Sequence, residues 1–428
     1  MSAIVIQADY TWLGDGFAAG VQVAVSAGGK IEAVGSLGRP VTHPLKHTAL
    51  LPGFITAHSH AFQRGLRGKG ERFPAAAGTF WTWRESMYQL VASLDPDSFR
   101  RLSLRAFREM RDAGITAVGE FHYLHHDRGT DHRFDEILVH AASQAGIRLV
   151  LLQAFYAYGG IGKPLEGAQR RFATPSLEQY WSQMDRLAGM IDPATQTLGV
   201  APHSIRAVGL DEIAALHQEA VRRNLPFHMH VEEQRAEIAE CVAAYGKTPM
   251  FLLNETLQSA GNLCAVHCTH TTSDDMTRFL QSGGAVCLCP LTEANLGDGV
   301  PELRRLAGAR LSLGTDSNAR ISMVEEMRLL EYGQRLRDER RGVLTDPTGR
   351  VATTALGAAT HGGAQALKLR AGRIEPGYWA DLVALDLSAP PLAELPMDAL
   401  LEGLVFGGGN EVISGTFVGG RWRASGRG

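Results

Sequence analysis

Residues 50–60 read LLPGFITAHSH, an apolar run that ends in two histidines. In an extended strand successive side chains point to opposite faces, so His58 and His60 point the same way. Two imidazoles on one side of a strand can bind a divalent transition metal. On its own the pair is also compatible with two packed or solvent-facing histidines, so its meaning depends on the rest of the chain.

Short apolar runs rich in Val, Ile, Leu, Ala or Cys recur along the chain, at residues 50–57, 115–121, 147–155, 198–201, 225–229, 264–267, 285–289 and 311–313. The segments between them include helical patterns, at residues 97–113, 134–145, 211–223, 274–281 and 323–340. Eight strand-then-helix units predict an α/β fold, a parallel (β/α)8 TIM-like barrel over residues 50–371. An open, doubly wound sheet is the alternative.

Both ends of the chain have a different pattern. Residues 21–34 alternate around a Gly28-Gly29 turn, which predicts a β-hairpin. Strand patterns return at residues 374–385, 411–414 and 416–418. Neither end has enough strands to bury a core alone. We therefore expect residues 1–49 and 372–428 to form one small β domain beside the barrel.

Polar residues end three further runs. His230 follows the fifth run, His267 ends the sixth, and Asp316 follows the eighth. Because the carboxyl ends of barrel strands meet at one mouth, these side chains can converge there with the first pair. The spacing to Glu233 favours His230 over its strand neighbour His228 as a ligand. The predicted metal ligands are His58, His60, His230 and Asp316.

Catalytic roles follow from a metal at this mouth. Bound metal lowers the pKa of its water toward ~7. Glu233 is then placed to shuttle the proton, unless it is only a solvated acid at the start of a helix. His267 would polarise the group under attack or stabilise the developing charge, and Asp316 would also hydrogen-bond the nucleophile.

The composition argues against nucleic-acid-binding and membrane proteins. The chain has 428 residues, 45% of them hydrophobic and 20% charged, and a formal net charge of −3 from 42 basic and 45 acidic residues. These values are ordinary for a soluble globular protein and give no case for binding nucleic acid or an anionic membrane. We expect no signal peptide, and no apolar stretch approaches the ~20 residues that span a bilayer.

The number of cysteines indicates the redox state of the compartment. Five cysteines are few and odd in number for this length, which argues against a disulfide framework and for a reducing cytoplasm. Cys287 and Cys289 are expected to be small buried strand residues. A second group of four residues could instead form a structural zinc knot, although a strand would send their side chains to opposite faces. That group is Cys264, His267, Cys268 and His270.

The HxH after the first run, the HxxE at the fifth, the His at the sixth and the Gly-Thr-Asp at the eighth resemble the amidohydrolase superfamily. The resemblance covers essentially the whole chain and implies a (β/α)8 barrel with a β-sandwich-like domain built from both termini. Many members bridge two metals with a carbamylated Lys on the fourth strand, but residues 198–203 contain no Lys. The chain therefore resembles the mononuclear deaminase branch, which implies one divalent ion per subunit. Zinc is the expected ion, although iron, manganese and nickel accept the same ligands.

Within that branch the chain is similar to the formimidoylglutamate deiminase family of histidine degradation. The similarity lies in HSHAFQRG (58–65), FWTWR (80–84), EFHY (120–123), PHSIR (202–206) and CPLTEANLGD (289–298). Nucleobase deaminases usually carry an Asn-Pro-Ser-Asn-like stretch after the seventh strand, which PLTEAN at 290–295 does not match. The resemblance implies a cytoplasmic homodimer that converts N-formimino-L-glutamate and water to N-formyl-L-glutamate and ammonia.

On the family pattern the substrate would contact Gln63, Arg84, Tyr123, His203 and Arg206. That substrate carries a cationic amidine and two carboxylates, which arginine forks bind bidentately. Each arginine could instead be a surface residue with a buried stem. Tyr123 could merely cap the barrel, and Gln63 could cap the following helix.

Two other functions remain compatible with the motifs. The same site could act on another amidine or on an aminated heterocycle such as guanine, although a heterocycle would not need two arginine anchors. A non-catalytic amidohydrolase-like scaffold is the second alternative, but every predicted ligand and acid–base group is present. We expect a small-molecule substrate with two carboxylates and neither nucleic acid nor a membrane as partner.

Overall fold

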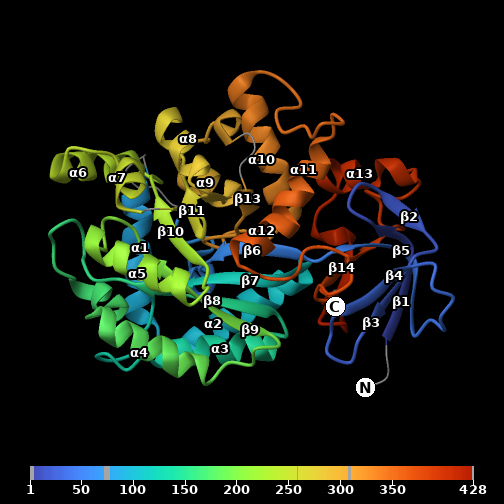
Figure 1. The fold of residues 1–428 in the computed structure, drawn as a ribbon, viewed down its shortest axis with the longest axis horizontal. Coiled ribbons are helices and arrows are strands. Elements are labelled where there is room, and N and C mark those ends of the chain that lie inside the picture. Colours follow the sequence, from blue (N-terminus) through green and yellow to red (C-terminus); the bar gives the residue numbers. More distant parts are fainter. Residues whose placement is uncertain (1–3, 72–77, 258, 307–309, 427–428) are drawn as a thin grey trace.

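Two sheets organise the chain, a parallel barrel and a separate mixed sheet (Figure 1). The computed structural model describes residues 4–71, 78–257, 259–306 and 310–426. In Figure 1 the barrel and its helices form the larger part at the left, and the mixed sheet lies at the right. Both chain ends lie on the side of the mixed sheet.

Eight parallel strands form the barrel, in the order in which they occur in the sequence. They are almost entirely buried, since both faces of a parallel sheet are covered, and this is why each was visible as an apolar run. The strands are β6 (Phe54–Ser59), β7 (Ile115–His122), β8 (Arg148–Phe155), β9 (Gln196–Pro202), β10 (Phe227–Val231), β11 (Leu263–His267), β12 (Ala285–Leu288) and β13 (Arg310–Leu313). The predicted barrel is confirmed.

Strand β13 closes the barrel against β6, so the sheet is not the open, doubly wound alternative. Ser59 and Asp316 form a parallel bridge between the two strand ends. The His60 N–H donates to the carbonyl of Asp316 at 2.8 Å, and the Asp316 N–H donates to the carbonyl of His58 at 3.1 Å. Three of the four predicted metal ligands therefore sit on the backbone hydrogen bonds that complete the barrel.

Helices surround the barrel (Figure 1). The predicted helical patterns correspond to α2 (Pro96–Asp112), α3 (Arg133–Ala145), α5 (Leu210–Arg222), α8 (Ser273–Gln281) and α10 (Met323–Asp338), and all five are confirmed. The start of α2 is fixed by Pro96 at its first position and by the Asp95 carboxylate, which accepts the Ser98 N–H at 2.7 Å. The remaining helices around the barrel are α1 (Phe80–Ser93), α4 (Leu177–Ala188), α6 (Arg235–Tyr245), α7 (Pro249–Thr256), α9 (Pro290–Leu296), α11 (Val351–Gly357) and α12 (Gly363–Ala366).

Both termini build the mixed sheet, as predicted. Its order is β16-β15-β14-β5-β1-β3-β4, with β2 paired to β1. The antiparallel pair β5–β14 joins the N-terminal strands to the C-terminal ones. The strands are β1 (Ile4–Trp12), β2 (Phe17–Ala19), β3 (Gln22–Val25), β4 (Ile31–Gly35), β5 (His43–Pro52), β14 (Leu382–Asp386), β15 (Ile413–Val418) and β16 (Arg421–Ala424). The strands predicted at 411–414 and 416–418 are one strand, β15, preceded by a short 3-10 turn and by the helix α13 (Leu400–Gly407).

The chain passes from the mixed sheet to the barrel at Gly53. The run predicted as one strand over residues 50–57 is in fact the end of β5 and most of β6. A Cβ atom on Gly53 would lie 2.2 Å from Oγ1 of Thr116, so only glycine fits between the two strands. The division into residues 1–49 with 372–428 and residues 50–371 stays a proposal. β5 itself continues to Pro52 within the mixed sheet.

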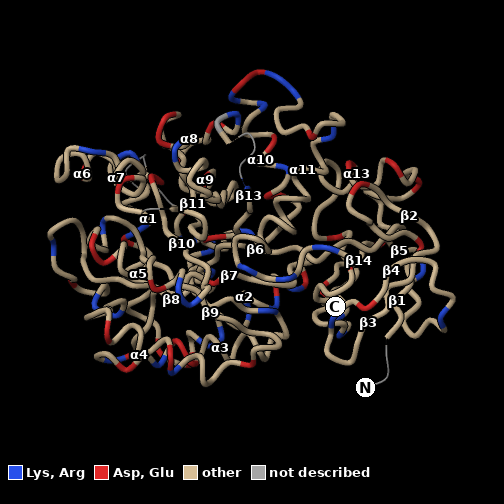
Figure 2. Tube along the Cα trace, in the orientation of Figure 1, with Lys and Arg blue, Asp and Glu red and all other residues tan. Residues whose placement is uncertain are grey.

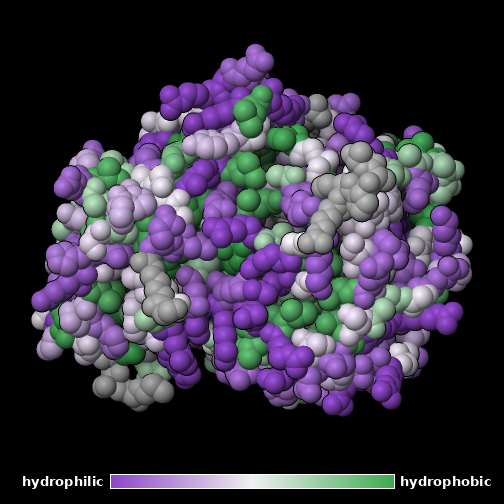
Figure 3. All heavy atoms as spheres, turned by 180° about the vertical axis from the view of Figure 1, so that it is seen from behind, coloured by the Kyte–Doolittle hydropathy of each residue, from purple (hydrophilic) through white to green (hydrophobic). Residues whose placement is uncertain are grey.

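Charges of both signs are interspersed over the two parts of the molecule (Figure 2). Seen from behind, hydrophobic residues are mixed with hydrophilic ones over the surface (Figure 3). Over the described residues, no helix combines the length and the apolar character that a bilayer crossing requires.

A buried ion pair joins the barrel to the mixed sheet. Arg148, at the start of β8, donates from Nε and Nη2 to the two carboxylate oxygens of Asp381 at 2.6 and 3.1 Å. The Gly419 N–H donates to the same carboxylate at 2.7 Å, and the guanidinium lies 4.1 Å from the ring centroid of Trp379. Only 3% of the Arg148 side chain and 1% of the Asp381 side chain is exposed. Water therefore cannot solvate either charge if its partner is removed.

We expect Arg148→Met to lower the free energy of unfolding by about 3–5 kcal/mol, because it leaves the Asp381 carboxylate buried without a cation. Urea denaturation followed by tryptophan fluorescence measures the change. Arg373→Met is the matched control, since its ion pair with Glu375 is about half exposed and is worth at most about 1 kcal/mol. Equal effects of the two substitutions would contradict a joining role for Arg148.

Candidate functional site

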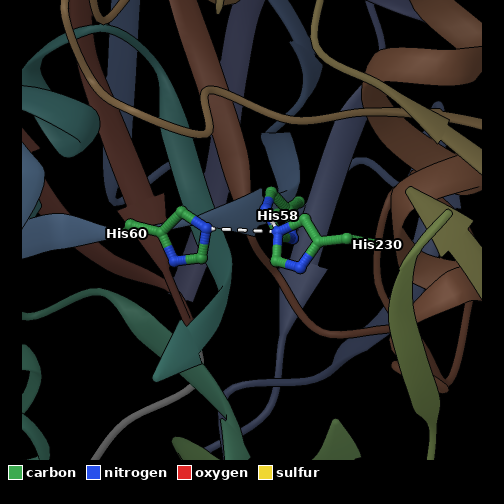
Figure 4. Close-up of side chains that lie close together, drawn as sticks. All are labelled: His58, His60 and His230. Atoms are coloured by element: carbon green, nitrogen blue, oxygen red, sulfur yellow. Dashed lines mark hydrogen bonds between the residues drawn. The ribbon is translucent and has the colours of Figure 1, made fainter. Parts of the chain in front are cut away.

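Three histidine side chains meet at the barrel mouth (Figure 4). His58 lies in β6, His60 directly follows it, and His230 lies in β10. The Nε2 atom of His230 is 3.2 Å from Nε2 of His58 and 3.4 Å from Nε2 of His60. All three side chains are buried. The structure therefore brings together three of the four predicted ligands.

Asp316, after β13, supplies the fourth. Its Oδ1 lies 3.3 Å from Nε2 of His58 and 3.4 Å from Nε2 of His60. Four ligand atoms about 2.0–2.1 Å from a tetrahedral zinc ion are about 3.3–3.4 Å apart from one another. Each of the four distances thus matches the separation of two ligands of one first-row metal ion.

Hydrogen bonds behind the histidines fix which ring nitrogen faces the site. The Nδ1–H of His60 donates to the carbonyl of Phe121 at 2.8 Å, and the Nδ1–H of His230 donates to the carbonyl of His203 at 2.9 Å. A carbonyl can only accept, so in both rings the Nε2 lone pair points inward. Without a cation between them these lone pairs would repel one another, and the residues therefore fit a divalent metal.

Burial keeps the histidines neutral, as metal binding requires. Desolvation lowers the pKa of His60 to about 3, with a further contribution from His58. Desolvation is also the first cause of the lowered pKa values of His58 and His230. His228, the alternative ligand on β10, lies apart from the group because its Nε2–H donates to the carbonyl of Ala366 at 2.9 Å.

His267, at the end of β11, lies among carboxylates. Its Nε2 is 3.8 Å from Oε1 of Glu233 and 3.8 Å from Oδ2 of Asp316, and its Nδ1 is 3.3 Å from Oε1 of Glu293. Burial lowers the pKa of His267, but these carboxylates outweigh burial and raise the pKa to about 10. The imidazole is therefore suited to stabilise negative charge beside the metal ligands.

Glu233 follows β10 and faces the same space. Burial raises the pKa of its carboxyl, and His267 opposes the rise while Asp316 adds to it. A carboxyl with a raised pKa can hold a proton near neutral pH and release it again. The structure thus places the predicted acid–base residue next to the predicted electrophile.

Unusual backbone conformations mark these strand ends. The φ angles are +53° at Glu232, +73° at His267 and +41° at Asp316, in the left-handed region that non-glycine residues rarely adopt. Such conformations cost of order 1–3 kcal/mol each and persist where the surrounding structure enforces them. They turn the chain at the ends of three strands so that the functional side chains reach the centre of the mouth.

A cavity of about 570 Å³ lies beside the metal ligands. All five predicted substrate-contacting residues line it, as do His60, His230, Glu233, His267 and Asp316. A second hollow of about 600 Å³ shares four of its walls, Arg84, Tyr156, His203 and Arg206. The predicted substrate residues therefore surround one space.

Local contacts argue against two of the alternatives left open for the cavity residues, the helix cap of Gln63 and the surface position of Arg206. The Gln63 amide donates to the hydroxyl of Tyr123 at 2.7 Å and does not cap a helix. Nε of Arg84 donates to the Tyr88 hydroxyl at 2.6 Å, and the guanidinium lies 5.1 Å from the ring centroid of Trp81. Arg206 is 9% exposed, so it is not a surface residue.

Four residues of the site were not predicted with a role. Tyr156 directly follows β8 and lines the cavity, so the strand-end rule could have identified it. Tyr88 lies one helical turn after Arg84. Glu293, behind His267, lies in a quoted motif but received no role. Glu120, in β7, accepts the Ala61 N–H at 2.6 Å and has a pKa raised to about 8 by burial; a strand interior gives no signal for such a residue.

The alternative zinc knot does not form. All five cysteines are free and buried, as expected for Cys287 and Cys289. In the described part of the chain, groups of residues that could hold a metal include neither Cys264, Cys268 nor His270. His267, the remaining member, lies close enough to Cys289 and Asp316 for a metal ion, so its group is part of the barrel mouth and not a separate zinc knot.

Known proteins are similar to the chain over nearly its whole length. The Amidohydrolase family model matches residues 49–423. A formimidoylglutamate deiminase of Pseudomonas aeruginosa is 40% identical, with 99% of this chain and 94% of that protein covered. A 5-methylthioadenosine/S-adenosylhomocysteine deaminase of Haloarcula marismortui is 29% identical, with 80% of this chain and 74% of that protein covered.

Solved structures have the same fold. An amidohydrolase from Brucella melitensis superposes with a TM-score of 0.89 at 34% identity, covering 99% of this chain and 95% of that one. An adenosine deaminase from Xanthomonas campestris with bound zinc superposes with a TM-score of 0.84 at 26% identity, covering 99% of this chain and 93% of that one.

We expect the purified protein to hold about one divalent ion per chain, as four ligands at one site imply, and His230→Ala to lose it. Removal of a ligand should weaken metal binding by more than the tenfold to hundredfold that loss of a group behind a ligand typically costs. Elemental analysis after dialysis measures the metal content. His203→Ala is the control, because its ring lines the cavity outside the ligand set. Metal retained by His230→Ala, or lost from His203→Ala, would contradict the ligand assignment.

Proposed function

The chain belongs to the amidohydrolase family, and we propose that it is a metal-dependent formimidoylglutamate deiminase. The reaction converts N-formimino-L-glutamate and water to N-formyl-L-glutamate and ammonia. The C–N bond to the imino nitrogen breaks, and a carbonyl oxygen from water takes its place. The similarity to a formimidoylglutamate deiminase along nearly the whole chain supports a hydrolytic deiminase activity.

One observation carries the proposal: three of the four metal ligands and two arginines face the same cavity. The substrate has a planar amidine at one end and two carboxylates at the other. The amidine carbon has to lie beside the three histidines, and the carboxylates need cationic partners a few atoms away. Arg84 and Arg206 provide them, since a guanidinium binds a carboxylate through two parallel hydrogen bonds. A neutral heterocycle such as guanine would leave both guanidinium groups without a partner.

His58, His60, His230 and Asp316 would hold the metal, which when bound supplies a nucleophile from water near neutral pH. Glu233 takes the proton that this water gives up and delivers it to the departing nitrogen. His267 assists charge stabilisation in the tetrahedral intermediate that forms when the amidine carbon is attacked. Asp316 orients the nucleophile through a hydrogen bond.

Polar groups on the cavity wall orient the substrate. The Gln63 amide and the Tyr123 hydroxyl are hydrogen-bonded to each other, so each holds the other in position. Gln63 Oε1 is buried and lacks a hydrogen-bond partner within the described residues. A substrate N–H can satisfy that oxygen, and His203 closes the wall between the metal ligands and Arg206.

Zinc, a homodimeric assembly, the cytoplasm and histidine degradation complete the proposal. Zinc is supported by the donor set of three imidazole nitrogens and one carboxylate oxygen, and by the zinc in the related Xanthomonas structure. Five free, buried cysteines support a reducing compartment. The homodimer and the place in histidine degradation rest on the family resemblance.

The direct test is ammonia release by zinc-loaded protein from N-formimino-L-glutamate, with guanine as the comparison substrate. We expect turnover of the formimino compound and none of guanine, because only the former has two carboxylates for the arginines. A coupled glutamate dehydrogenase assay reports the ammonia. Ammonia release from guanine alone, or from neither compound with metal bound, would contradict the substrate assignment and leave the metal-site assignment unaffected.

Glu233→Gln should lower kcat by a factor of about 10²–10⁴, because an amide cannot carry the proton, while the metal content stays unchanged. Steady-state kinetics and elemental analysis of one preparation measure both quantities. Glu178→Gln is the control, since Glu178 lies exposed in the first turn of α4. Turnover within tenfold of the unchanged protein would remove Glu233 from the acid–base role.

A further inference from the structure

A buried carboxylate lies behind Arg206. Glu237, in the first turn of α6, has no exposed surface. Its Oε1 lies 3.9 Å from Nε of Arg206. Within the described residues neither Glu237 oxygen has a hydrogen-bond partner of normal geometry, and neither has Nε of Arg206. An isolated buried carboxylate is costly, so this unsatisfied pair requires an explanation.

The two charges depend on each other. Burial is the first cause of the raised pKa of Glu237, and Arg206 opposes the rise. Burial also opposes the charge of Arg206, but Glu237 and Glu233 outweigh it and raise the pKa of the guanidinium. Each group is therefore the main counter-charge of the other. Arg206 keeps its cation in a nearly water-free wall because Glu237 stands behind it.

Geometry shows which part of Arg206 is left for a ligand. Glu237 approaches the guanidinium at Nε, the atom nearest the side-chain stem. The residue lines both the cavity beside the metal ligands and the adjoining hollow. With Glu237 on the Nε side, the two outer nitrogens are the atoms left to bind a carboxylate in these spaces.

We propose that Glu237 is a positioning residue for anion recognition: it holds the Arg206 guanidinium so that the outer nitrogens receive one substrate carboxylate. This inference rests on the proposed function for the identity of the substrate. Glu237 itself does not touch the substrate. It sets the direction of the arginine and balances its charge before the ligand arrives. Arg84 is held differently, by the Tyr88 hydroxyl and the Trp81 ring, so the two arginines are independently supported.

The test compares Glu237→Gln, Arg206→Met and the double variant. Calorimetry gives the Kd of the product N-formyl-L-glutamate for zinc-loaded protein, and steady-state kinetics gives KM and kcat. We expect Glu237→Gln to weaken product binding and raise KM about fivefold to tenfold, with kcat within about twofold, because orientation is lost and the reacting groups are untouched. In the Arg206→Met background the same change should alter Kd by less than about twofold, since coupled residues are not additive. Glu178→Gln, the same substitution at an exposed position in the first turn of α4, should have no effect.

Several outcomes would overturn the proposal. Tighter product binding by Glu237→Gln would mean that the carboxylate competes with the substrate instead of orienting the arginine. An equal loss of product affinity with Arg206 present and in the Arg206→Met background would mean that Glu237 does not act through Arg206. A fall in kcat alone would mean that Glu237 acts through Glu233. Glu237→Asp, which keeps the charge, replaces Glu237→Gln if the latter does not fold. Because Kd is measured without turnover, absence of ammonia release with intact product binding would remove the proposed function only.

Discussion

The backbone hydrogen bonds between β6 and β13 are the constraint on which the rest of the site depends. Closing an eight-stranded barrel requires its first and last strands to pair in one register. Here that register sets Ser59 opposite Asp316, and the backbones of His60 and His58 on either side of Ser59 hydrogen-bond to Asp316 at 2.8 and 3.1 Å. Three ligands are therefore positioned by the fold itself and not by a loop. A one-residue slip would turn both histidines to the other face of the strand. Gly314 contributes to the same junction, since a Cβ there would lie 2.8 Å from the His58 carbonyl oxygen.

Electrostatics explains why this closed mouth suits a cation. Burial makes every charge there expensive, and the carboxyl groups crowd around one histidine. His58, His60 and His267 draw the pKa of Asp316 well below its usual value, whereas burial and Glu233 raise the pKa of Asp298 to about 9. Neighbouring carboxyls thus differ widely in pKa, which separates a permanent anion from groups able to carry protons. A divalent ion among the three neutral imidazoles would add the positive charge that Asp316 needs.

The sequence predicted the barrel and the convergence of the proposed metal ligands at its mouth, because both rest on local rules. Buried parallel strands are apolar runs, and ligands such as His230 come where a run ends. The rules failed where a tertiary contact decides the outcome. The run at 50–57 gave no sign that the chain changes sheets at Gly53, since the reason is the Thr116 side chain of another strand. Glu237 was equally invisible: it is an ordinary acid in a first helical turn, and only packing shows that it lies against Arg206. The division of the chain into two domains, and the roles of the residues around the cavity, remain predictions.

Histidine clustering shows why composition alone cannot identify a metal site. His122, His125 and Asp135 also lie close enough together to hold an ion. Their distances separate them from the barrel mouth: both ring nitrogens are 2.9 Å from Asp135 Oδ1, a hydrogen-bond length. The other oxygen of Asp135 accepts from Gln153 and Gln183 at 2.6 and 2.8 Å. Donors thus saturate this carboxylate, and the network ties β7 and β8 to α3 and α4. At the barrel mouth, in contrast, the Nδ1–H groups of His60 and His230 donate to backbone carbonyls behind them. Their Nε2 lone pairs therefore remain directed at a common point. The direction of the donors, more than the number of histidines, distinguishes a metal centre from a polar core.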